Sequence, residues 1–84
     1  MNDELCALMF LSVHDVLRAE KLLLAAGIKP RLIPVPKQVS PDCGLAVQAP
    51  CPALAEVRRV LAPLASRLKG CYRIDGASFV PWEG

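Results

Sequence analysis

The sequence predicts an α+β fold in which an antiparallel, four-stranded sheet carries two helices on one face. Short apolar runs and two segments of helical periodicity follow one another in the order β-α-β-β-α-β. Glycine and proline stand at the boundaries between them. The chain has 84 residues, of which 54% are hydrophobic and 21% charged, enough for one core but not for two. We therefore expect a single domain over residues 1–84, with a core at about 4–75 and a tail at 76–84.

The first half of the chain is expected to form a strand, a helix and a second strand. Residues 4–11 are nearly all apolar, which is typical of a strand covered on both faces. Ser12 offers a helix N-cap and Gly27 a helix end. Residues 31–35 predict a strand, and Pro34, which has no amide hydrogen to donate, favours an edge position. The stripe of the helix expected to face the core consists of Val13, Val16, Leu17, Leu23 and Leu24.

The second half repeats the alternation after a loop at residues 36–42. Residues 44–49 predict a third strand, and a helix follows from Pro52 to Gly70, with Pro63 expected to kink or break it. Residues 71–75 predict a fourth strand, and the tail carries Phe79 and Trp82. This order is that of the ferredoxin-like, split βαβ architecture. Right-handed connections would place the first strand between the third and the fourth.

Composition and charge exclude several classes of protein. No apolar stretch approaches the roughly 18 residues that a membrane-spanning helix needs. The net charge of +2 comes without a run of Lys or Arg and without interleaved aromatic residues. We therefore expect neither a membrane nor a nucleic acid as partner.

Four cysteines are present: Cys6, Cys43, Cys51 and Cys71. They form no CxxC pair, and His14 is the only histidine, so neither a metal nor another cofactor is expected. No export signal is visible, and the apolar core looks adequate without cross-links. We therefore expect reduced thiols and a cytoplasmic location.

The predicted topology brings residues 12–14, 37–43 and 69–71 to one end of the sheet and leaves Cys6 and Cys51 toward the other. Cys43 would then lie at a loop tip, facing a helix N-terminus. Helix amides and nearby cations, here Lys37 and Arg18, favour the reactive thiolate form of a cysteine. His14 could relay a proton, and Gly44 would let a large sulfur or selenium substituent approach the backbone.

Each of these residues also has an ordinary structural interpretation. Cys43 could be an inert loop residue, and His14, Arg18 and Lys21 could form a solvated helix face. Cys6 is best explained as core filling. Cys71 lies two strands from Cys43 in the predicted sheet, so core packing is favoured over a role as a resolving thiol.

Three motifs in order resemble the selenium/sulfur carrier-like domain family. They are H-x-x-L-x-A-E-K-x-L from His14 to Leu23, I-P-x-P from Ile33 to Pro36, and the pair Cys43-Gly44. The resemblance covers roughly residues 5–75. It implies that Cys43 is the carrier cysteine and that His14 and Lys37 match the family's helix-start histidine and basic loop residue. We further expect Arg18, Gly44 and Ser40 to belong to the binding site.

The leading hypothesis is therefore a carrier that holds sulfur or selenium on Cys43 as a persulfide or perselenide. Its partners would be a donor, such as a cysteine desulfurase or a selenium donor, and an acceptor enzyme. It would be a carrier rather than a stand-alone enzyme. The alternative is a ligand-binding or protein-interaction module that uses the tail and the edge strand with Pro34. A redox couple of Cys43 and Cys71 is a third hypothesis, and homodimer formation is left open.

Overall fold

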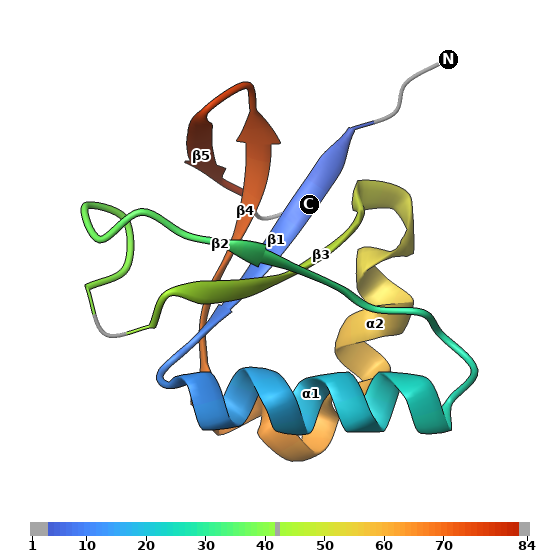
Figure 1. Ribbon diagram of the computed structural model, residues 1–84. Coiled ribbons are helices and arrows are strands. Elements are labelled where there is room, and N and C mark those ends of the chain that lie inside the picture. Colours follow the sequence, from blue (N-terminus) through green and yellow to red (C-terminus); the bar gives the residue numbers. More distant parts are fainter. Residues whose placement is uncertain (1–3, 42, 83–84) are drawn as a thin grey trace.

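The computed structural model describes residues 4–41 and 43–82. It has an α+β fold with one five-stranded antiparallel sheet in the order β2-β3-β1-β4-β5 (Figure 1). β1 lies between β3 and β4, as predicted. The strands are β1 (Leu5–Phe10), β2 (Arg31–Pro34), β3 (Leu45–Pro50), β4 (Leu68–Asp75) and β5 (Ser78–Pro81). The helices are α1 (Val13–Ala25) and α2 (Leu54–Val60), with 3-10 helices η1 (Cys51–Ala53) and η2 (Ala62–Arg67) on either side of α2.

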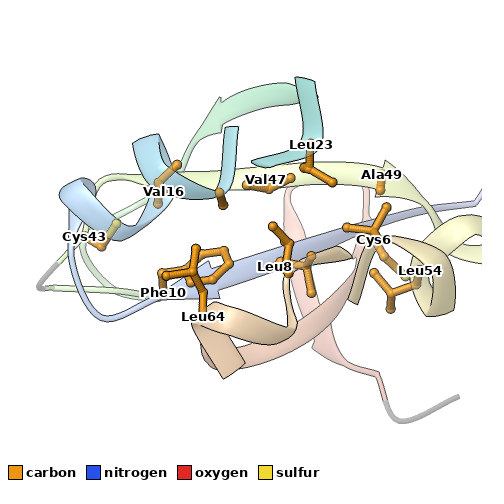
Figure 2. Packing of buried hydrophobic residues seen from close by; sticks show 13 residues of the cluster. Cys6, Leu8, Phe10, Val16, Leu23, Cys43, Val47, Ala49, Leu54 and Leu64 are labelled. Carbon is orange, nitrogen blue, oxygen red and sulfur yellow. The ribbon is translucent and has the colours of Figure 1, made fainter. Parts of the chain in front are cut away.

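Alternate residues of β1 enter two apolar clusters, one on each face of the sheet. On the helical face, side chains from β1 and β3 meet those of both helices and η2 (Figure 2). That cluster comprises Cys6, Leu8, Phe10, Val16, Ala19, Leu23, Cys43, Val47, Ala49, Leu54, Val57, Leu61 and Leu64. The smaller cluster on the other face comprises Ala7, Met9, Val35 and Ala46. β1 is thus covered on both sides, which explains its uninterrupted apolar sequence.

α1 begins and ends where its sequence predicts, but it is rotated about its axis. Asp15 N donates to the Ser12 hydroxyl at 3.3 Å, and Gly27 adopts a φ of +79° just past the helix. The buried stripe is Asp15, Val16, Ala19 and Leu23. Val13, Leu17 and Leu24, which were expected in the core, are 39%, 41% and 56% exposed. The prediction was wrong for these three residues because the helix turns the small Ala19 and the ion-paired Asp15 inward.

The prediction of a four-stranded sheet was also wrong, because residues 78–81 of the expected tail form β5 against β4. The two-residue turn between them starts at Gly76, with a φ of +62°, in the manner of hairpins with glycine at the first turn position. The ferredoxin-like assignment stays a prediction. β4 begins at Leu68, three residues before its expected start at Cys71. The preceding helix breaks at Leu61, shortly before Pro63.

Cys6 and Cys51 form a disulfide between β1 and η1. The expectation of four reduced thiols was therefore wrong, and with it the thiol argument for a cytoplasmic location. The two residues meet because β1 and β3 are antiparallel, with Leu5 opposite Pro50, and the amide of Cys51 donates to the carbonyl of Glu4 at 3.0 Å. Within the described residues, no helix is long and apolar enough to cross a membrane.

Candidate functional site

The end of β1, the first turn of α1 and the start of β4 meet at one end of the sheet. The amide of Leu11 donates to the carbonyl of Arg67 at 3.0 Å. The Arg67 guanidinium then contacts Asp15, with both its Nε and an Nη within 3.0 Å of Oδ2. The Ser12 hydroxyl donates to the same carboxylate oxygen at 2.9 Å. This network fixes the N-terminus of α1 against the strand ends, next to the loop that carries Cys43.

Asp15 was not among the predicted site residues, yet it is a buried charged residue at this end of the sheet. Its side chain is 5% exposed. The hydrogen bond from Arg67 lowers the pKa of the Asp15 carboxyl below its ordinary 3.8, against the opposing effect of burial. The hydrogen bond from Ser12 and the charges of Arg67 and Arg18 lower this pKa further. Asp15 is therefore ionised at neutral pH and serves the fold of this end.

Cys43 lies beside the first turn of α1, near Val16 (Figure 2). The position agrees with the predicted convergence, but the expected exposure does not, because Cys43 is only 2% exposed and belongs to the apolar cluster. Its thiol donates a hydrogen bond to the carbonyl of Leu45 at 3.1 Å. Cys43 is outside the disulfide, so its sulfur is chemically available once the loop admits a reagent.

Ser40, in the same loop, is 2% exposed, and its Oγ has no hydrogen-bond partner within the described residues. Its own amide closes a turn onto the carbonyl of Pro36 at 3.1 Å. A buried hydroxyl without a partner costs about 1–3 kcal/mol of stability. Such a group is unusual in a native fold and is able to bind a further donor or acceptor.

Gly44 follows the thiol and is exposed, and a Cβ placed there would meet no heavy atom within 4 Å. Space beside the backbone is thus present at the position where the sequence predicted it. The carbonyl of Gly44 accepts from the amide of Val35 at 2.9 Å, which ties the two ends of the loop together.

The other predicted site residues form no hydrogen bond with the Cys43 thiol within the described residues. His14 and Lys37 are both exposed, and no hydrogen bond joins either one to the thiol in the part of the chain that the structure describes. Arg18 lines a groove with Lys21, Leu22 and Pro63. In the described ranges, no group of three or more His, Cys, Asp or Glu side chains could hold a metal ion.

Cys71 is the second thiol outside the disulfide, and it lies opposite Leu8 on β4. Burial raises the pKa of the Cys71 thiol, and this effect outweighs the opposite effect of the Arg58 charge. Cys71 is therefore protonated at neutral pH, in line with a packing role. The amide of Trp82 donates a hydrogen bond to the backbone carbonyl of Cys71 at 2.9 Å.

Comparison with known proteins identifies one family. A family model described as "putative Se/S carrier protein-like" matches residues 5–73, from the start of β1 into β4. The match spans both the loop with Cys43 and the helix that packs beside it. No curated protein and no solved structure matches the chain.

Proposed function

Since the chain belongs to the selenium/sulfur carrier-like family, we propose that it carries a sulfur or selenium atom on Cys43. The observation that carries the proposal is the family match over a chain whose loop thiol, Cys43, stays outside the disulfide. The unpartnered Ser40 hydroxyl in the same loop supports it, because a bound chalcogen would offer that buried group a hydrogen-bond acceptor.

The transfer is a thiol exchange that needs no oxidant. The Cys43 thiolate attacks the outer sulfur of a persulfide on a cysteine desulfurase-like donor. A bond forms between Cys43 Sγ and that sulfur while the donor's own S–S bond breaks. The donor thiolate leaves with the electron pair. An acceptor nucleophile later takes the outer atom and returns Cys43 to its thiolate, and selenium follows the same sequence.

The burial of Cys43 adds a step to this scheme. With the side chain 2% exposed, the loop at 36–44 has to open before a donor can reach the sulfur. The same burial would shield a loaded persulfide from reductants and from water. His14 and Lys37 are exposed, so in this proposal they act on the donor during transfer rather than on the resting thiol.

Trapping the loaded atom tests the proposal. The protein is incubated with a cysteine desulfurase and cysteine, alkylated, digested without reductant and analysed by mass spectrometry. We expect one additional sulfur on the Cys43 peptide and none in Cys43→Ser. Cys71→Ser is the matched control and should load normally. Loading on Cys71 instead, or no loading in the wild type, would contradict the proposal.

The interaction module remains the second candidate; β2, which carries Pro34, is an edge strand as predicted, but the two aromatic residues of the tail are packed. Phe79 and Trp82 are half-buried and pack against the two apolar clusters, so the tail is not a free surface. Of the large apolar side chains that are exposed, those of Val13, Leu17 and Leu24 lie on α1 and that of Leu11 just precedes it, while Leu5 and Val80 lie on β1 and β5. Full biological activity in Cys43→Ser would favour this candidate.

A further inference from the structure

A groove of about 290 Å³ lies between α1 and η2, apart from Cys43 and its loop. It is lined by two cations, Arg18 and Lys21, and by two apolar residues, Leu22 and Pro63. In Figure 1, the chain that follows α2 turns back and passes beside α1, and η2 contacts that helix. Three- and four-residue spacing places Arg18, Lys21 and Leu22 on neighbouring positions of one helix face.

The charges around the groove are unbalanced. Arg18 and Lys21 are exposed, and neither forms an ion pair within residues 4–41 and 43–82. The charge of Arg67, at the end of η2, is matched by Asp15. The charge of Arg18 acts on the same carboxylate of Asp15, but that carboxylate is already hydrogen-bonded to Arg67. The rim of the groove therefore keeps two positive charges for a ligand from outside.

We propose that this groove docks an acidic segment of a partner protein, with a carboxylate on Arg18 and Lys21 and a neighbouring apolar side chain on Leu22 and Pro63. The charged rim suits a carboxylate, because arginine binds carboxylates through paired hydrogen bonds. The volume is at the lower limit of the roughly 300–1,000 Å³ of small-molecule pockets, so it fits one or two side chains of a peptide. The apolar floor distinguishes this groove from a plain anion site. The inference does not depend on whether Cys43 carries a chalcogen.

Titration with a model peptide, followed by amide chemical shifts in NMR, tests the proposal. The probe is a capped five-residue peptide of alternating Glu and Leu, and the comparison peptide has Gln in place of each Glu. We expect shifts that cluster at residues 18–22 and 62–66 with the Glu peptide and at least fivefold weaker binding of the Gln peptide. Binding should weaken as salt is added, since exposed charges are screened.

Variants separate a specific groove from a general effect of positive charge. Arg18→Gln combined with Lys21→Gln should weaken binding at least fivefold. Lys29→Gln combined with Arg31→Gln removes the same charge from two exposed positions elsewhere and should change the affinity less than twofold. Equal losses in both double variants would overturn the proposal, as would the absence of localised shifts. Glutarate that binds as tightly as the peptide would also overturn it, since the groove would then be a small-molecule site.

Discussion

Breaking the disulfide between Cys6 and Cys51 should cost a large part of the stability of this small domain. The bond closes a loop across a sequence separation of 45 residues. Loop-closure entropy for a ring of this size corresponds to about 4 kcal/mol at 25 °C, and measured disulfides contribute about 2–4 kcal/mol. A domain of this size has only about 5–10 kcal/mol of net stability, so the loss is substantial.

Urea unfolding of the oxidised and the reduced protein measures this contribution, with the fluorescence of the single tryptophan, Trp82, as the signal. For a slope of about 1 kcal/mol per M urea, the midpoint of the reduced protein should be about 2–4 M lower. Cys51→Ser should behave like the reduced protein and show no response to reductant. Cys71→Ser replaces another half-buried thiol, one outside the disulfide, and should keep the full response.

Two results would refute the reasoning. Alkylation of the unfolded, unreduced protein should modify two cysteines, Cys43 and Cys71, and modification of all four would show that the bond does not form. If the bond is present but reduction leaves the midpoint unchanged, the loop-entropy estimate does not apply to this chain. In that case the unfolded state would already be compact enough to hold the two cysteines near each other.

Three further predictions concern single residues. Because Arg67 lowers the pKa of Asp15 below 3.8, the stability contributed by this carboxylate is present above pH about 4 and is lost as the pH falls through the lower folded-state pKa. Urea midpoints measured between pH 5 and 2.5 should therefore fall less steeply in Asp15→Asn than in the wild type, and parallel profiles would contradict this. Gly76→Ala places a side chain at a φ of +62° and should destabilise the domain by about 1–2 kcal/mol in thermal unfolding. In the control Gly44→Ala the φ is not positive and the space is open, so the stability should change by less than about 1 kcal/mol, and similar losses in both variants would refute the distinction. Ser40→Ala removes a buried, unpartnered hydroxyl and should raise the free energy of unfolding by about 1 kcal/mol, while shortening the lifetime of a persulfide on Cys43. A loss of stability in this variant would mean that the hydroxyl has a partner in solution.

The sequence predicted those features that depend on neighbours along the chain. Ser12, Gly27 and the proline and glycine boundaries act within a few residues, so the order of elements and the ends of α1 follow from them. The central place of β1 follows from its uninterrupted apolar run combined with the handedness of the connections. β5 was missed because Asp75-Gly76-Ala77 is a short turn signal with only four strand residues after it.

The features that were predicted wrongly depend on residues far apart in the sequence. The rotation of α1 follows from the pairing of Asp15 with Arg67, which is 52 residues away. Periodicity within the helix could not reveal it, since Val13 and Leu17 fit the apolar pattern as well as Ala19 does. The disulfide likewise needs the register between β1 and β3, which places Leu5 opposite Pro50 and thereby brings Cys51 back to Cys6.

The contrast between the two pairs of cysteines bears directly on the proposed role of Cys43. The disulfide fixes the end of the sheet remote from Cys43, where β1 begins and β3 ends (Figure 2). At the other end, Asp15 and Arg67 hold α1 on the strand ends, and the hydrogen bond from Val35 to Gly44 ties together the loop between β2 and β3. In the proposed function, this loop opens and exposes its thiol while the disulfide and the Asp15–Arg67 pair keep the rest of the fold in place. Under the proposed function, burial of Cys43 at rest and transfer from an opened loop are therefore compatible, and we propose that the stability of the loop sets how often a donor reaches the sulfur.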